Sequence, residues 1–252
     1  MQKHGGNGLW EPHFLSWHRV FLFFFEAVLK QAAVESRETT AFDLPYWNWY
    51  EDPLPQIFKE GDEKTNPLYV RGSLAGGSVD LDKLIPGLST APFLSDDFLI
   101  APGVPPENTF LYQLDENPHG TVHDLVAGDM GRVPTAARDP IFWFHHVNLD
   151  RLWTAWMKSG SRRLPARDSA WGRTSWFFDP SGNWKATAGD MLNSETSFGY
   201  RYDDETLPSV SVAVASALPS RTLEALPLSA AMAPPMDEAA PSSTATTLSQ
   251  TA

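Results

Sequence analysis

A long apolar run near the N-terminus predicts a buried helix. Between Arg19 and about Glu35 the chain has no proline or glycine, and aromatic residues alternate with good helix formers. We therefore predict a helix that begins near His18. Its most apolar part, residues 20–29, contains Glu26. Crossing a bilayer takes about 20 apolar residues, so this helix is expected in a protein core.

The same start signal predicts two further helices. Asn-Pro at 117–118 and Asp-Pro at 139–140 each place a capping residue before a proline, which is favoured at the first helical position. Gly128 is expected to end the first of these helices. The second should extend to about Lys158.

Loops and a tail account for most of the rest. Residues 36–116 carry nine prolines with glycines among them, which is typical of loops with short elements. Residues 175–183 have the pattern of a strand and a turn. After Tyr202 there is no aromatic residue, and Pro, Ala, Ser and Thr dominate, which is too little bulk for a second core. We expect one domain over 1–206 and a tail or linker over 207–252.

The composition indicates which kinds of binding partner to expect. The chain has 252 residues, 42% of them hydrophobic, which suffices for one core. Its 31 acidic and 19 basic residues give a net charge of −12. Nucleic acids are bound by clustered Lys and Arg, so no nucleic-acid partner is expected. The start lacks the apolar stretch of a secretory signal. We expect a soluble protein with no membrane span and assign neither a compartment nor an oligomeric state.

The seven histidines form two groups that suggest two metal ions. They are His4, His13 and His18 near the N-terminus, and His119, His123, His145 and His146 in the second half. Residues four apart on a helix lie about 40° apart on one face, so His119 and His123 can bind one ion. Adjacent residues point about 100° apart, so only one of His145 and His146 can join them.

The ligand types favour a redox metal. Imidazole suits copper, zinc, iron and nickel alike. Structural zinc sites usually include cysteine, which this chain lacks, and dinuclear hydrolases usually include carboxylates. Both groups here can be completed by nitrogen ligands alone, and three nitrogens per ion leave positions open for a substrate.

The residues around these histidines resemble the copper signatures of the tyrosinase and catechol oxidase (polyphenol oxidase) family, the type 3 dicopper proteins. Residues 139–153 read DPIFWFHHVNLDRLW, and residues 14–19 read FLSWHR, with Glu26 further along. Residues 43–49, DLPYWNW, resemble the family's LPYWDW segment, which we expect to be aromatic packing. The resemblance extends to about Tyr202. It implies a mainly α-helical four-helix bundle around a dinuclear copper site, with long loops and a few short strands.

The resemblance also implies roles for the second half of the site. The metal ligand is the second histidine of the pair, His146, and His145 is a packed or substrate-lining residue. Arg19 and Asp150 are expected to form a buried pair. That pair either orients ligand imidazoles, as outer-shell groups commonly do, or serves only to stabilise the fold.

The first site departs from the family pattern. The family's second ligand usually lies nine residues before the Trp-His-Arg histidine, where this chain has Leu9. One interpretation takes His4, His13 and His18 as the three ligands. The other takes His4 as the second ligand, displaced by a five-residue insertion, so that the first ligand and its helix would precede Met1. The absence of cysteine removes a thioether common in plant, fungal and molluscan members and favours a bacterial type.

Three positions near the second copper bear on the reaction. The resemblance implies that monophenol hydroxylation is favoured by Asn directly after the first ligand, where this chain has Gly120, and by an upstream Glu that holds a water. That Glu corresponds to Asp115, with Glu116 adjacent. Val133 matches a gate position where a small side chain leaves the copper accessible; ordinary core filling is the alternative.

The resulting hypothesis is a dicopper enzyme. It oxidises phenolic substrates, converting o-diphenols to o-quinones with O2, and weak monophenol hydroxylation (monooxygenase activity) stays open because a carboxylate is retained. The alternatives are a hemocyanin-like O2 carrier and a degenerate member with an incomplete first site. The small size, the lack of a tandem repeat and the small gate residue argue against the carrier.

Overall fold

The computed structural model describes residues 12–37, 42–62, 64–69, 88–177 and 185–209. The helices are α1 (Phe14–Glu35), α3 (Phe110–Leu114), α4 (Thr121–Val126), α5 (Pro140–Lys158) and α6 (Ser194–Phe198). The strands β1 (Ser175–Phe177) and β2 (Lys185–Thr187) pair antiparallel. The prediction of a mainly α-helical fold is confirmed. Of the predicted tail, residues 210–252 lie outside the described residues.

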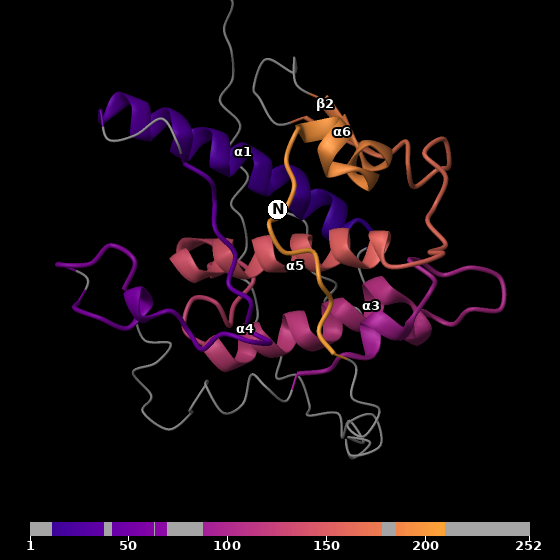
Figure 1. The fold of residues 1–252 in the computed structure, drawn as a ribbon, viewed down its shortest axis with the longest axis horizontal. Coiled ribbons are helices and arrows are strands. Elements are labelled where there is room, and N and C mark those ends of the chain that lie inside the picture. The colour runs from indigo at the N-terminus through magenta and orange to yellow at the C-terminus, as the bar shows by residue number, and fades with distance from the viewer. Residues whose placement is uncertain (1–11, 38–41, 63, 70–87, 178–184, 210–252) are drawn as a thin grey trace, which may run out of the picture. The chain divides into compact units, whose positions relative to one another are not determined.

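Short helical turns connect the longer helices. They are η1 (Gln56–Phe58), η3 (Ala91–Leu94), η4 (Pro106–Asn108), η5 (Asp115–Gly120), η6 (Ala136–Arg138) and η7 (Ala188–Leu192). In Figure 1, α5 lies between α1 and the row formed by α3 and α4. None of the helices in the described part of the chain is long and apolar enough to cross a membrane.

Helix α5 forms the centre of the fold, and it begins and ends where the sequence predicted. It begins at Pro140, and the side chain of Asp139 caps it by accepting a hydrogen bond from the backbone N–H of Ile141 (3.1 Å). Most of its length from Ile141 to Trp156 is buried. Because consecutive residues from His145 to Trp156 are all buried, whichever side of the helix they face, α5 is packed on all sides for most of its length.

An additional helix, α3, precedes the one predicted to begin at 117–118. Residues up to 116 were expected in a loop, but Thr109 caps α3 by accepting from the N–H of Tyr112, and Phe110 and Leu114 are fully buried. A kink at residue 117 separates α3 from a second helix, which begins at Pro118 as predicted, since a residue before proline is pushed out of the helical region. Asn117 accordingly has extended angles (φ −152°, ψ 114°). The predicted end is confirmed: the backbone turns to positive φ at Ala127 and Gly128.

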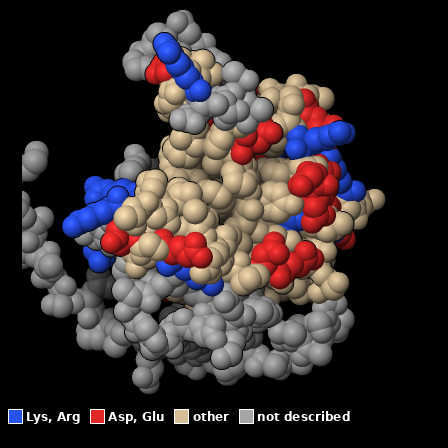
Figure 2. All heavy atoms as spheres, turned by 60° about the vertical axis from the view of Figure 1, so that its left-hand side comes forward, with Lys and Arg blue, Asp and Glu red and all other residues tan. Residues whose placement is uncertain are grey.

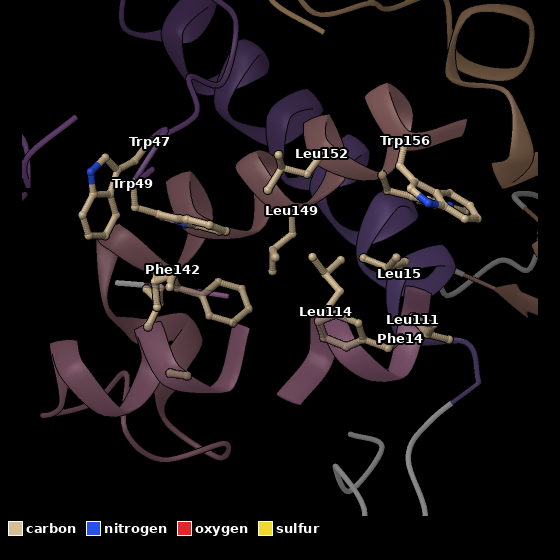
Figure 3. Close-up of a cluster of buried hydrophobic side chains, with 14 of the residues drawn as sticks. Phe14, Leu15, Trp47, Trp49, Leu111, Leu114, Phe142, Leu149, Leu152 and Trp156 are labelled. Carbon is tan, nitrogen blue, oxygen red and sulfur yellow. The ribbon is translucent and has the colours of Figure 1, made fainter. Parts of the chain in front are cut away.

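Helix α1 supplies the N-terminal face of the core. It begins at Phe14, slightly before the predicted start, and its buried residues are concentrated in the first half. Figure 3 shows side chains from α1, α3 and α5 converging, among them Phe14, Leu114 and Leu149. Trp47 and Trp49 of the DLPYWNW segment are each 1% exposed, so the expected aromatic packing there is confirmed.

The charged surface agrees with the acidic composition. On the face drawn in Figure 2, Asp and Glu side chains gather in several patches among uncharged residues. Several exposed or partly exposed basic side chains form ion pairs with acids. Lys158, at the end of α5, contacts Glu195 and Glu205 at 2.7 and 2.6 Å.

A buried ion pair joins α1 to α5. Arg19 Nε lies 2.6 Å from Asp150 Oδ1, and the two side chains are 0% and 3% exposed. The hydroxyls of Tyr200 and Tyr202 both donate to Asp150 Oδ2, each at 2.6 Å. Arg19 also donates to Thr154 Oγ1 at 2.6 Å. The pair therefore ties two helices and the segment after α6 to one carboxylate.

The energetics of this pair depend on its partners. Burial opposes the charge on Arg19, but the neighbouring Asp150 outweighs it and the pKa of Arg19 is raised. Burial and the same carboxylate raise the pKa of Tyr200 and Tyr202 well above 10, so both hydroxyls stay protonated as donors. A buried charge is tolerated when it is paired and hydrogen-bonded, and this one is.

Breaking this pair should destabilise the fold far more than breaking a surface pair. We expect Asp150→Asn to lower the free energy of unfolding by about 3–5 kcal/mol, because Arg19 would be left as an uncompensated buried charge. Lys158→Met is the control, since exposed pairs contribute at most about 1 kcal/mol. Chemical denaturation measures both. Equal, small losses in the two variants would contradict the assigned importance of the buried pair.

Candidate metal centre

Five imidazole rings converge between α1, α4 and α5. His18 comes from α1, His119 from η5, His123 from α4, and His145 and His146 from α5. Ring centroids are 4.6 Å apart for His18 and His146, 4.6 Å for His119 and His123, and 5.2 Å for His123 and His146. One ring nitrogen from each of His119, His123, His145 and His146 lies within 4.8 Å of the others. This spacing is that of a group able to hold a metal ion.

The positions of these rings follow from the packing of the helices. His18 is adjacent to Arg19, and His146 lies one helical turn before Asp150. The ion pair between α1 and α5 therefore holds the two rings in register, and they stack at an interplanar angle of 18°. Phe14 fills the space beside them, with its ring centroid 4.6 Å from that of His18.

Backbone carbonyls set the hydrogen-bonding state of four of the rings. The Nδ1 atoms face Phe14 O (His18, 2.8 Å), Asp115 O (His119, 3.1 Å), Met130 O (His123, 2.7 Å) and Phe142 O (His146, 2.8 Å). A carbonyl oxygen only accepts, so each Nδ1 must carry the hydrogen. In a neutral ring the lone pair is then on Nε2. All four rings thus have the tautomer that binds a metal through Nε2.

The rings on α5 are held neutral. Burial lowers the pKa of His145 and His146 well below the usual 6.5, and the neighbouring imidazoles lower it further. Neutral imidazole is the form that binds metals. A set of neutral nitrogen donors with Nε2 lone pairs fits copper, so the residues present are suited to the metal that the sequence signatures imply.

The histidines expected in the first site are not all brought together. His4 lies outside the described residues. His13 lies at the start of α1, where its Nε2 is 3.3 Å from Trp171 O and its ring stacks on the Trp171 indole with centroids 5.6 Å apart. Of the first group, His18 alone has described ring contacts with the histidine cluster. A ligand role for His13 stays a prediction, and these contacts place its ring against tryptophan.

Asp115 directly contacts a ligand candidate. Its Oδ1 lies 2.8 Å from His119 Nδ1, and its side chain is 19% exposed. A carboxylate behind a ligating histidine fixes the ring and raises its basicity. The adjacent Glu116 is exposed, and Gly120 directly precedes α4. The structure therefore places Asp115 behind His119, a contact that the sequence did not predict.

The remaining predicted residues lie at the edges of the site. Val133 is 54% exposed, in the loop whose Met130 carbonyl binds His123. Exposure of this size contradicts the alternative that Val133 fills the core.

The described hydrogen bonds of Arg19 and Asp150 go to each other and to residues outside the cluster, including Thr154, Tyr200 and Tyr202. The pair thus makes no described hydrogen bond to an imidazole; it stabilises the packing of α1 on α5 and affects the rings only through the helices that carry them.

One contact of the site was missed at the sequence level. Trp49 Nε1 donates to His145 Nδ1 at 3.0 Å. The DLPYWNW segment predicts aromatic packing but no contact with the histidines. Nothing in a sequence pattern shows where an indole N–H will point across a tertiary contact between residues 96 positions apart.

Comparisons with known proteins identify a family whose members are named tyrosinase and polyphenol oxidase. The family model for the common central domain of tyrosinase matches residues 4–82 and 101–159. The chain is 31% identical over 185 residues to tyrosinase HcTyr1 of Hahella sp. (strain CCB-MM4). This match covers 63% of this chain and 39% of that protein. It is 30% identical over 245 residues to the chloroplastic polyphenol oxidase of Spinacia oleracea, covering 79% of this chain and 38% of that protein.

Solved structures share the fold. Latent apple tyrosinase (MdPPO1) matches with a TM-score of 0.58 at 24% identity, over 82% of this chain and 50% of that chain. A latent aurone synthase (polyphenol oxidase) matches with a TM-score of 0.55 at 25% identity, over 74% of this chain and 44% of that chain. The chain spans about two fifths of the length of the curated relatives it matches (39% and 38%).

Removing the carboxylate behind His119 should weaken metal binding. We expect Asp115→Ala to raise the Kd for a metal at the second site by about 10–100-fold, the usual effect of losing such an outer partner. Glu116→Ala is the matched control, because that side chain is exposed and should change the Kd little. Competition with a chromogenic chelator measures the affinity. An unchanged Kd in Asp115→Ala would show that the carbonyl of residue 115 suffices to hold the ring.

Proposed function

This chain belongs to the tyrosinase family, and we propose that it is a polyphenol oxidase that converts o-diphenols to o-quinones with O2, using two copper ions. The observation that carries the proposal is the cluster of five imidazoles. Four of them have Nδ1 bound to a backbone carbonyl and therefore turn Nε2 to the metal. When bound, a copper pair supplies the exchange of two electrons between a catechol and O2.

The ligands divide between the two ions. His119, His123 and His146 would hold the second copper, since one ring nitrogen of each lies within 4.8 Å of the others. His18 would hold the first copper, because its ring stacks on that of His146. We keep His4 and His13 as proposed ligands of the first copper.

The protein's own contribution is to bind the phenol and handle its protons. Oxidation of a catechol to a quinone releases two protons, which need an acceptor. Asp115 uses Oδ1 to hold His119, and its partly exposed carboxylate has a second oxygen, Oδ2, that can accept a proton directly or through a water. We propose this role for Asp115, with Glu116 at the surface beside it as the next acceptor.

Access to the second copper is proposed to pass Val133. Its exposed side chain belongs to the loop that is anchored to His123 through the Met130 carbonyl. A valine is small compared with an aromatic ring, so a bulky substituted phenol can approach. The same argument favours an enzyme over a closed O2 carrier.

Quinone formation and metal content together test the proposal. The copper-loaded chain should oxidise 4-tert-butylcatechol, and His123→Ala should abolish this activity and lower copper from two per chain to about one, because two remaining ligands bind weakly. The zinc-loaded chain is the control and should form no quinone. Two coppers with reversible O2 binding but no quinone would indicate a carrier. Fewer than two coppers in the unaltered chain would indicate an incomplete first site.

The balance between monophenols and diphenols should depend on residue 120. An added Cβ at Gly120 would lie 3.4 Å from Asp115 O, so a larger side chain fits with a slight adjustment. We expect Gly120→Asn to raise the ratio of tyramine hydroxylation to catechol oxidation severalfold, since an amide can hold a water against Asp115. Gly120→Ala is the control for the added Cβ. Initial rates on the two substrates give the ratio, and an equal change in both variants would refute a role for the amide.

A further inference from the structure

We infer that Trp49 fixes the tautomer of His145 and so makes this residue a hydrogen-bond donor inside the metal centre instead of a ligand. The acceptor of this hydrogen bond would be a catecholate oxygen of the substrate. In that respect the inference rests on the proposed function. It concerns two adjacent histidines, His145 and His146, that residue type and burial do not distinguish.

The direction of one hydrogen bond decides the tautomer. Trp49 Nε1 lies 3.0 Å from His145 Nδ1. An indole nitrogen is only a donor, so Nδ1 of His145 must present its lone pair. Trp49 is 1% exposed and His145 is 0% exposed, so water does not compete for this bond. In a neutral ring whose Nδ1 accepts, the hydrogen is on Nε2.

His145 therefore has the opposite tautomer to the other four histidines. Their Nδ1 atoms donate to carbonyls, and their Nε2 atoms carry lone pairs. To bind a metal through Nε2, His145 would have to lose its hydrogen or break the bond to Trp49. His146, with Nδ1 bound to Phe142 O, has no such obstacle. The two neighbours on α5 thus have opposite chemical functions.

The hydrogen on His145 Nε2 lacks an acceptor in the described part of the chain. This nitrogen is buried and makes no hydrogen bond. A buried donor without a partner is costly and rare in native proteins. The His145 ring is surrounded by His119, His123 and His146, at centroid distances of 5.5, 5.0 and 4.9 Å. Its N–H therefore points among the ligands, where an oxygen of negative charge is the strongest acceptor.

Nitrogen-15 NMR of the metal-free protein tests the tautomer directly. We expect His145 to show the Nε2–H pattern and His18, His119, His123 and His146 the Nδ1–H pattern. Trp49→Phe should release His145 into a tautomer mixture. The matched control is Trp47→Phe, because Trp47 is also 1% exposed but donates to the carbonyls of Asp52 and Pro53. An Nδ1–H pattern for His145 in the unaltered protein would overturn the inference, whether or not Trp49→Phe folds.

Zinc and 4-nitrocatechol test the donor role without any catalysis. His145→Leu should bind as much zinc as the unaltered chain, while its Kd for 4-nitrocatechol rises about tenfold, as expected for the loss of a hydrogen bond to a charged oxygen. His145→Gln keeps an N–H and should recover most of the affinity. Loss of zinc from His145→Leu would make His145 a ligand and overturn the inference. A confirmed tautomer in a chain that forms no quinone would refute only the proposed function.

Discussion

The ion pair between Arg19 and Asp150 is the interaction on which the arrangement of the metal centre depends. Each partner lies next to a ligand candidate in the chain: Arg19 follows His18, and Asp150 lies one turn beyond His146. Burying two charges costs more than their attraction returns unless every oxygen and N–H is satisfied. Here both carboxylate oxygens are used, because Arg19 occupies one and two tyrosine hydroxyls occupy the other. The segment after α6 is thereby part of the site's support.

Most of the rings are oriented by hydrogen bonds to backbone carbonyls that are close in sequence. His18 and His146 each bond through Nδ1 to the carbonyl four residues earlier on the same helix, and His119 bonds to the carbonyl of Asp115 across the kink at Asn117. A helical side chain points back toward the preceding turn, so this contact is short and needs no tertiary partner. It leaves Nε2 at the far edge of the ring, directed away from the helix. His123 differs, since its partner is the Met130 carbonyl in the following loop, which ties the centre to the segment that contains Val133.

The features predicted correctly from sequence are those that local chemistry decides. Helix α5 begins at Pro140 because an aspartate cap and a proline act within one turn. The Pro-rich composition of residues 36–116 predicts loops and does not show α3, a short helix that Thr109 caps and whose Phe110 is buried. Among site residues, His119 and His123 follow from their spacing. The Trp49 contact and the position of His13 against Trp171 depend on the packing of distant segments, which no periodicity encodes.

The pair at 145–146 shows why ligand identity is not a property of residue type. Both side chains are imidazoles, both are buried, and burial lowers the pKa of both, so neither charge nor exposure separates them. What separates them is the partner of Nδ1. The carbonyl behind His146 requires that Nδ1 donate, which leaves the lone pair on Nε2. The indole N–H behind His145 requires that Nδ1 accept, which leaves the hydrogen on Nε2. In the proposed function, His146 would bind the metal and His145 would donate to the substrate oxygen, because their outer partners have opposite polarity.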